Sequence, residues 1–293
     1  MWVIFSLLTS MISAVYDLCN QNSKLKAEVF IIYRGLFVAM LATPLALLYF
    51  HIFPWQFYAI ALFQGLTISY MDYKYFQAFH EFGAENVNSV KPLTVLIIFV
   101  LWLILKPSII GHYMATPLRS AVILAALATI IFAVMKYRHQ KIGKECLKKV
   151  FPLLFLSSII DISNKLITEY NDGYLLALTF HRVALTGYII GTVNLLIYQR
   201  KNICLKELIS LQNLRRGSFI ILLVLSMITI NLAMHYTPNP AYTTAVIYLS
   251  VVWIMFINKI QILAGKKLIY QPIEKKWIFA LLISAIVLVL LTQ

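Results

Sequence analysis

The sequence predicts an all-α integral membrane protein, in which ten transmembrane helices form two inverted five-helix repeats around a central cavity. Of its 293 residues, 61% are hydrophobic and only 12% are charged, whereas a soluble domain is roughly half apolar and a quarter charged. The mean hydropathy is +0.83. Its apolar runs approach the roughly 20 residues that a helix needs to cross a bilayer, whereas barrel strands would alternate over roughly ten residues.

Ten apolar stretches follow one another along the chain and define the expected spans. They cover residues 2–19, 29–50, 55–78, 86–105, 117–135, 151–168, 174–198, 217–236, 241–263 and 276–292. The first stretch has no basic residue before it and no small-x-small cleavage site after it, so we expect a retained helix and not a signal peptide. The polar connection 136–150 separates an expected first repeat, 1–145, from a second repeat, 146–293.

A polar pattern in the first span recurs in the sixth span at a constant distance along the chain. The positions Thr9, Ser13 and Tyr16 are followed 148 positions later by Ser157, Asp161 and Asn164. In the next span of each half, Arg34 and Arg182 are also 148 positions apart. One offset shared by two segments predicts an internal repeat of five helices per half. Because an odd number of spans per repeat reverses the second half, this plan is typical of inverted-repeat transporters.

The fifth and tenth spans, which would be equivalent in the repeat, both carry small residues four positions apart. These are Ala121 and Ala125 in the fifth span, and Ala280 and Ser284 in the tenth. Such spacing lets membrane helices approach closely. It indicates either a shared packing or dimer seam, or chance in alanine-containing helices. A monomer and a homodimer both remain compatible with the sequence.

Basic residues gather in the connections that follow the odd-numbered spans. The net charge is +14, and the connections 136–150 and 199–216 are the richest in Lys and Arg, while residues 51–54 have none. Short loops rich in Lys and Arg usually face the cytoplasm. We therefore expect the connections after odd-numbered spans to be cytoplasmic and both termini to lie outside. Membrane orientation explains the positive charge without nucleic acid as a partner.

Polar side chains at helical spacing within spans one, three, four, six, eight and nine predict a central polar cavity. The candidate substrate-binding residues are Tyr16, Tyr70, Asn88, Lys91, Asp161, Asn164, Asn231 and Tyr248. An ionisable group inside an apolar helix is a functional candidate by default. Asp161 could bind an ammonium group or a coupling proton, and Lys91 could bind a carboxylate or a phosphate as a point charge. Together they fit a zwitterion such as an amino acid.

Several of these residues also have a structural interpretation. Asp161 could pair with Lys165 one turn away, and Lys91 could extend its amine to the membrane interface. The arginines Arg34 and Arg182 lie near helix ends, and anchoring or gating is a more common role there than substrate contact. Pro92 follows Lys91 and frees a backbone carbonyl one turn earlier, so we group it with the arginines as a structural or gating residue. The tyrosines of span nine could simply pack between helices.

No catalytic arrangement is found in the sequence. Suitably spaced carboxylate pairs, a nucleophile elbow and a phosphate-binding loop are all missing. The three cysteines, Cys19, Cys146 and Cys204, have no metal-binding or disulfide spacing. The sequence therefore predicts a protein that is not an enzyme and that uses no cofactor or metal.

In this pattern the chain resembles the drug/metabolite transporter superfamily, in particular its ten-helix EamA-like branch. The resemblance covers the whole chain and rests on the five-plus-five repeat and on the arginines in IIYRGLFVAM and TFHRVALTGY. It also rests on YKYFQAF followed by GAENVNSVKPLTVLIIFVLWLIL, where Pro92 falls at the family's usual proline. The second half has no proline at the like position, where Leu249 or Ser250 stands. The family usually keeps both termini in the cytoplasm, contrary to the loop charges.

The resemblance implies two inverted five-helix bundles around a substrate cavity, in a family that moves amino acids, amines, nucleotide-linked metabolites and drugs. We therefore expect a multi-pass permease of the plasma (inner) membrane, which transports a small polar metabolite of amino-acid or amine type by alternating access. Its partners would be the small-molecule substrate, a coupling proton and membrane lipid. A flippase for a lipid-linked sugar or phospholipid, and a non-transporting membrane scaffold, are the alternatives.

Overall fold

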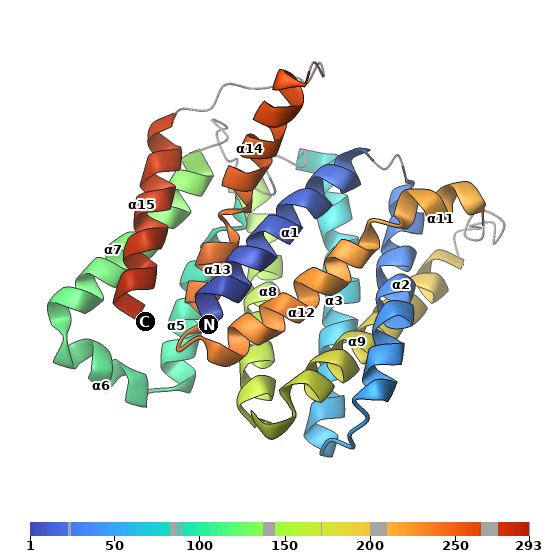
Figure 1. Cartoon of the computed structure of the whole chain (residues 1–293), viewed down its shortest axis with the longest axis horizontal. Coiled ribbons are helices and arrows are strands. Elements are labelled where there is room, and N and C mark those ends of the chain that lie inside the picture. The colour runs from blue at the N-terminus through green and yellow to red at the C-terminus, as the bar shows by residue number, and fades with distance from the viewer. Residues whose placement is uncertain are drawn as a thin grey trace.

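The computed structural model describes residues 1–22, 25–82, 87, 90–136, 144–170, 172–199, 210–264 and 275–292, and this part of the chain is helical, without a strand (Figure 1). The helices of the first half are α1 (Trp2–Asn22), α2 (Ala27–Leu48), α3 (Trp55–Phe82), α5 (Leu93–Leu105), α6 (Ser108–Ala115) and α7 (Pro117–Lys136). Those of the second half are α8 (Lys144–Tyr170), the 3₁₀ turn η1 (Asp172–Tyr174), α9 (Leu175–Gln199), α11 (Leu211–Gly217), α12 (Ile220–Tyr236), α13 (Pro240–Ile247), α14 (Ser250–Leu263) and α15 (Lys275–Thr292).

The fold is that of a helical protein with several membrane-spanning helices. Helical residues occupy all ten ranges predicted from the sequence. Within the described residues, seven helical stretches are long and apolar enough to cross a membrane, or eight if α5 and α6 together form one bent span. Helix α5 has only 13 residues, and α3 carries polar side chains on more than one side, among them Gln64, Asp72 and Lys74.

Two of the differences between the helix boundaries and the predicted spans follow from packing and from a proline. Helix α8 begins at Lys144, seven residues before the predicted start at 151, because Cys146 and Val150 on one face of its polar first turns are buried against Ala78. The straight part of span four begins only at Leu93, because Pro92 has no backbone N–H to donate.

Two further helical features were not predicted. Span nine is split into α13 and α14 by a turn at Tyr248 and Leu249, although no proline occurs there. The connection after span four contains α6, which is bent by 110° from α5. Pro107 precedes α6, and its ring suits a helix start, where the missing N–H would have no partner in any case. Figure 1 shows α6 running across the lower end of the molecule.

Helices α2 and α9 cross in close contact, which only glycine allows. A Cβ atom on Gly35 would lie 2.1 Å from the backbone nitrogen of Gly191, and one on Gly187 would lie 2.7 Å from that of Ala39. Small residues at such crossings let the two backbones meet. The two helices start at opposite ends of the molecule in Figure 1, α2 at the upper end and α9 at the lower.

Other helix pairs complete the bundle around this crossing. Helix α1 packs along α12, α3 packs on α8 and α9, α7 packs on α15, and α5 packs on α8 and α13. The largest buried cluster includes Trp102, Ile130, Tyr242 and Leu288, and joins α5, α7, α13 and α15. A second cluster joins α2, α9 and α12.

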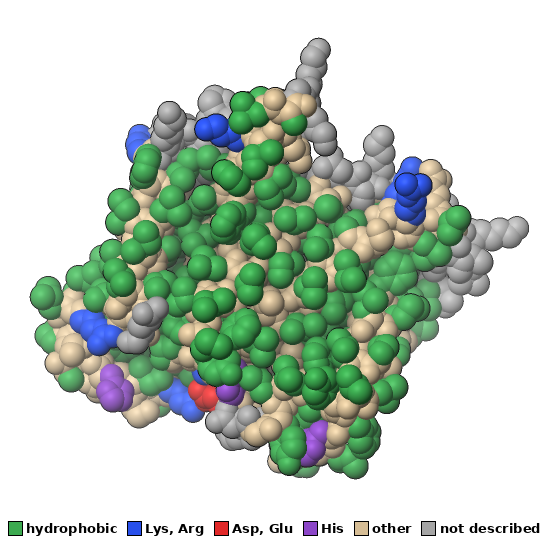
Figure 2. All heavy atoms as spheres, viewed as in Figure 1, with side chains coloured by type: hydrophobic (Ala, Val, Ile, Leu, Met, Phe, Trp, Pro, Cys, Tyr) green, Lys and Arg blue, Asp and Glu red, His purple; other side chains and the backbone are tan. Residues whose placement is uncertain are grey.

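The outer surface is apolar across the middle of the molecule. Figure 2 shows mainly hydrophobic side chains on the visible face, with Lys and Arg near its upper and lower edges. Large apolar residues such as Leu48 and Leu118 are 74% and 81% exposed. A soluble protein rarely exposes so large a continuous apolar surface, whereas a lipid-facing surface requires one.

Candidate functional site

The most strongly buried charge in the described chain is the guanidinium of Arg182 on α9. Arg182 is only 3% exposed. Its Nη1 donates to Gln64 Oε1 at 3.0 Å and to the Asn164 side-chain oxygen, and its Nη2 donates to the Asn231 side-chain oxygen. Gln64, Asn164 and Asn231 come from α3, α8 and α12, and each is at most 5% exposed. The sequence thus brings four helices together around one cation.

Gln64 connects this arrangement further, since its Nε2 donates to Asn164 at 2.8 Å and to the Ser163 hydroxyl at 2.7 Å. We call Arg182, Gln64, Asn164 and Asn231 the arginine–amide cluster. Within the described residues, no carboxylate oxygen lies within 4.0 Å of the Arg182 nitrogens. Amide oxygens are uncharged acceptors, so the cluster satisfies hydrogen bonds without neutralising the charge.

The Asp161 side chain and the Lys91 backbone both contact α13 or the turn that follows it. The Thr244 hydroxyl donates to Asp161 Oδ2 at 3.4 Å, and the hydroxyl of Tyr248 donates to the Lys91 backbone carbonyl at 2.8 Å. Thr244 and Tyr248 are four residues apart, hence one turn apart on one side of a helix. Tyr248 also lies 3.1 Å from the Thr94 hydroxyl, and the Lys91 amine lies 5.2 Å from the centre of the Tyr75 ring.

Arg34 forms a separate polar contact near the opposite end of the bundle. Its Nη1 donates to Asp72 Oδ1 at 2.7 Å, and the two side chains are 28% and 11% exposed. Arg34 and Arg182 each follow the first residue of their helix, Ala27 and Leu175, by seven positions, which is about 10 Å at the rise of an α-helix. Because α2 and α9 begin at opposite ends, the two arginines lie at similar depths from opposite faces.

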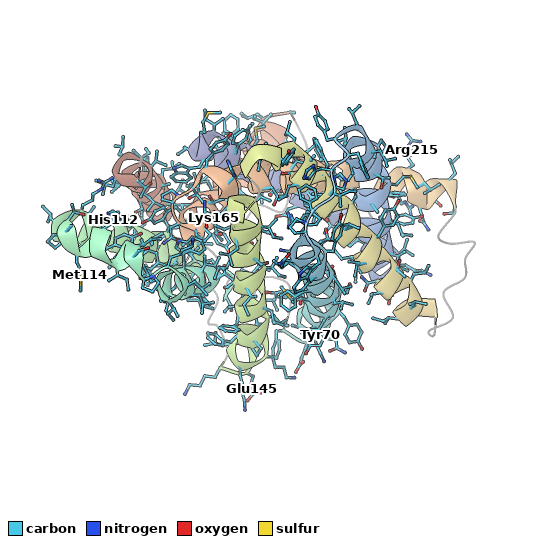
Figure 3. All side chains as sticks on the ribbon, turned by 90° about the horizontal axis from the view of Figure 1, so that it is seen from below. Tyr70, His112, Met114, Glu145, Lys165 and Arg215 are labelled. Carbon is cyan, nitrogen blue, oxygen red and sulfur yellow. The ribbon has the colours of Figure 1, made fainter. Side chains whose placement is uncertain are left out.

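The predicted site residues fall into three groups in the structure. Asn164, Asn231 and Arg182 meet in the arginine–amide cluster, and Lys91, Asp161 and Tyr248 gather around α13. Tyr16 instead packs between Phe30 and Phe219 at ring distances of 6.4 and 5.5 Å. Tyr70 is 52% exposed on the outside of α3 and points away from the clusters in Figure 3. Asn88 lies outside the described residues, and Pro92 precedes α5 at its first turn.

The alternative pairing of Asp161 with Lys165 does not occur. Lys165 Nζ lies 3.4 Å from Glu169 Oε1 and donates to the His235 backbone carbonyl at 3.0 Å. Glu169 also pairs with Lys106 at 3.0 Å. The three side chains bridge α8 to the end of α5, at the lower end where Figure 3 labels Lys165. Asp161 thus keeps its position beside Thr244 instead of pairing along its own helix.

Sequence reasoning left Gln64, Asp72 and Thr244 out of the candidate site residues, although Gln64 and Thr244 belong to polar faces that it expected to line the cavity. Gln64 belongs to the polar face of span three with Thr67 and Lys74, so its helical spacing was a usable signal. Asp72 lies on another side of that helix, and only the packing of α2 against α3 gives it Arg34 as a partner.

A scan against protein-family models finds no match, and a search of the curated proteins finds none either. Among the described residues, no group of three or more His, Cys, Asp or Glu side chains could hold a metal ion. The described site offers charged and hydrogen-bonding groups, with Arg182 and Asp161 in the interior between α8, α9 and α13.

Proposed function

We propose that this chain is a secondary transporter, which moves a small polar metabolite of amino-acid or amine type across the plasma (inner) membrane by alternating access. The observation that carries the proposal is the arginine–amide cluster, where four apolar helices converge on one buried cation. An intramembrane charge costs several kcal/mol unless it is paired or faces water. A chain that retains such a group where an apolar residue would pack has a use for it, and solute binding is the use that fits.

An inverted repeat, with ten helices crossing the membrane, is part of the same proposal and is supported by the helix contacts. Three helix pairs that would be related by the repeat pack on each other, namely α2 with α9, α5 with α13, and α7 with α15. The contact of α1 with α12 likewise has a counterpart in that of α8 with α3. At the crossing of α2 and α9, the touching residues Ala39 and Gly187 are 148 positions apart, which is the offset that the sequence predicts.

The proline of span four also acquires a counterpart. Pro240 begins α13 and lies 148 positions after Pro92, which precedes α5. The comparison with Leu249 and Ser250, which found no proline at the position like Pro92, does not follow the 148-position offset. With Pro240 as the equivalent residue, spans four and nine both start at a proline. This agreement favours the resemblance to the ten-helix EamA-like transporters, which we retain as part of the proposal.

Unequal exposure of the two arginines supports alternating access. The side chain of Arg34 is 28% exposed, whereas the residue Arg182 is 3% exposed and its partner Asn231 is fully buried. In an inverted repeat, the two arginines exchange environments when the halves rock from one state to the other. The described conformation would then be closed around Arg182 and more open around Arg34.

Transport by the purified protein in liposomes tests the proposal. A thermal-shift screen of amino acids and amines first selects the solute, because a ligand that binds only the folded protein raises the unfolding temperature. We expect Asp161→Asn and Lys91→Met each to abolish uptake of that solute while the unfolding temperature stays near that of the wild-type protein. The charges act on the solute in this proposal, so their loss should affect transport and not folding.

Exposed residues provide the matched controls. Lys149→Met removes a lysine whose side chain is 52% exposed and which pairs with Glu81 at the surface, and Glu145→Gln removes an exposed carboxylate. Both should transport normally. If Asp161→Asn and Lys91→Met also transport normally, the charges are structural and the zwitterion proposal fails. Movement of a fluorescent lipid without solute uptake would instead favour the flippase alternative.

A further inference from the structure

Arg182 lacks the counter-ion that the equivalent arginine possesses. Arg34 pairs with Asp72 on α3 at 2.7 Å, while Arg182 meets Asn231 on α12. In each half, the arginine lies on the second helix and its partner on the third. Asn231 thus contacts its arginine from α12 as Asp72 does from α3, although it lies 11 positions beyond Ile220, the residue at the 148-position offset from Asp72. The more deeply buried of the two cations thus has an amide where the other has a carboxylate, and Asp161, the carboxylate that acts on it electrostatically, makes no direct contact with it.

Unused hydrogen-bond donors lie at the same place. Nδ2 of Asn231 and Nε of Arg182 are buried and have no hydrogen-bond partner. Nε of Arg34 is also without a partner, so this atom alone does not distinguish the two sites. The unpartnered amide nitrogen of Asn231 and the missing carboxylate distinguish the Arg182 site from the Arg34 site. A buried donor without an acceptor lowers the stability of the protein, and an acceptor group brought in by a ligand would satisfy these donors.

We propose that Arg182 and Asn231 form a subsite for the carboxylate group of the transported solute. A guanidinium binds a carboxylate through two parallel hydrogen bonds, a geometry that a lysine cannot offer. A bound carboxylate would supply the counter-ion that Asp72 supplies to Arg34, and would accept from Asn231 Nδ2. Its arrival would displace amide oxygens, which are weaker acceptors because they carry no charge.

The position of Asp161 extends the subsite to a zwitterion. Asp161 lies three residues before Asn164 on α8, hence on the same side of the helix. Its Oδ2 accepts a hydrogen bond from the Thr244 hydroxyl of α13. It would bind the ammonium group of the solute, while Arg182 would bind the carboxylate. This inference deepens the proposed transport function and rests on it for the identity of the solute. The presence of a carboxylate subsite can be tested without transport.

The test uses the purified full-length chain in detergent, with propionate as the probe. We expect sodium propionate to raise the unfolding temperature of the wild-type protein above that in sodium chloride of equal concentration. Asn231→Asp would place a fixed carboxylate beside Arg182, as Asp72 stands beside Arg34. This variant should be more stable than the wild-type protein without any ligand, and it should lose most of the shift caused by propionate.

Asn194→Asp is the matched control, because Asn194 is fully buried on the same helix as Arg182 but about three turns away. A carboxylate placed there gains no cation, so we expect a lower unfolding temperature and an unchanged response to propionate. General salt effects would shift the unfolding temperatures of all three proteins alike. Should Asn194→Asp fail to fold, the comparison of wild-type protein with Asn231→Asp still decides the question.

The subsite is refuted if propionate does not raise the unfolding temperature of the wild-type protein. It is also refuted if Asn231→Asp keeps the full propionate-induced rise, or if this variant is no more stable than the wild-type protein without ligand. Transport is judged separately. A response to propionate that Asn231→Asp loses, together with liposomes that take up no solute, would support the subsite and refute the transporter. Solute uptake by a protein that propionate does not affect would support the transporter and refute the subsite.

Discussion

At the scale of single residues, the arginine–amide cluster combines a charge with acceptors that do not neutralise it. Gln64 has a particular place in it, because its oxygen accepts from Arg182 while its nitrogen donates to Asn164 and Ser163. Its side chain therefore holds α3, α8 and α9 in register. Hydrogen bonds between helices within a membrane contribute on average less than 1 kcal/mol each, but loss of a partner of a buried charge costs more.

We expect Gln64→Leu to reduce the free energy of unfolding by about 1–3 kcal/mol, because it removes one hydrogen-bond acceptor of the buried Arg182 and one donor to the buried Asn164. The measurement is the unfolding temperature of the purified variant. Gln77→Leu is the control on the same helix, since Gln77 is exposed and accepts only from Lys74 at 3.2 Å. It should change the free energy by less than about 0.5 kcal/mol. Equal effects of the two substitutions would contradict a structural role for the cluster.

At the scale of helices, the crossing of α2 and α9 is the closest contact between the two halves. Gly35, Gly187 and Gly191 create it, since each would bring a Cβ atom within 3.0 Å of the other helix. The contact fixes the distance between the helices that carry Arg34 and Arg182. Its glycines thus determine how far apart the two arginines lie. The hydropathy of α2 or of α9 alone does not reveal this close contact.

We expect Gly35→Ala to lower the free energy of unfolding by about 1–3 kcal/mol, because its Cβ would lie 2.1 Å from a backbone atom that cannot move alone. Gly111→Ala in α6 is the opposite case, as no atom lies within 4 Å of its Cβ position. There the substitution should be neutral or stabilise by up to about 1 kcal/mol, because alanine restricts the unfolded chain. Unfolding temperatures of both variants decide the point. A Gly35→Ala protein as stable as Gly111→Ala would show that the crossing is loose.

At the scale of the whole molecule, charge is distributed between the two ends unequally. Arg215 and Arg216 lie in the last turn of α11, which is at the upper right of Figure 1. Helix α6 is at the lower left. Arg119, Lys106 and His112 lie near that lower end. Much of the connections 136–150 and 199–216 falls outside the described residues, but their flanking helix ends lie at the upper end.

We expect the upper end to face the cytoplasm, because short loops rich in Lys and Arg are retained there. In a cysteine-free background, Met114→Cys on α6 and Leu211→Cys on α11 provide probes at sites that are 76% and 82% exposed. A membrane-impermeant maleimide should label Met114→Cys in intact cells, and Leu211→Cys only after permeabilisation. The reverse pattern would place both termini inside, as the family resemblance implies, and would overturn the inference from loop charge.

The sequence by itself determined the helical fold, the position of each apolar segment and the offset that links Arg34 to Arg182. These follow from hydropathy and helical spacing, which are local patterns and can be recognised in the amino-acid sequence alone. It also singled out Asn164, Asn231 and Asp161, because an ionisable or amide group inside an apolar run is conspicuous without knowledge of its neighbours. The two asparagines are buried and Asp161 is half-buried.

Only the tertiary structure decided which polar groups meet. It pairs Lys165 with Glu169 and not with Asp161, turns Tyr70 outward, and gives Arg182 the amide of Gln64, which lies 118 positions earlier in the chain. The bend between α5 and α6 and the break before α14 were likewise hidden. The reason is physical: a helix face has several polar residues, and the angle at which another helix crosses it determines which of them acquires a partner.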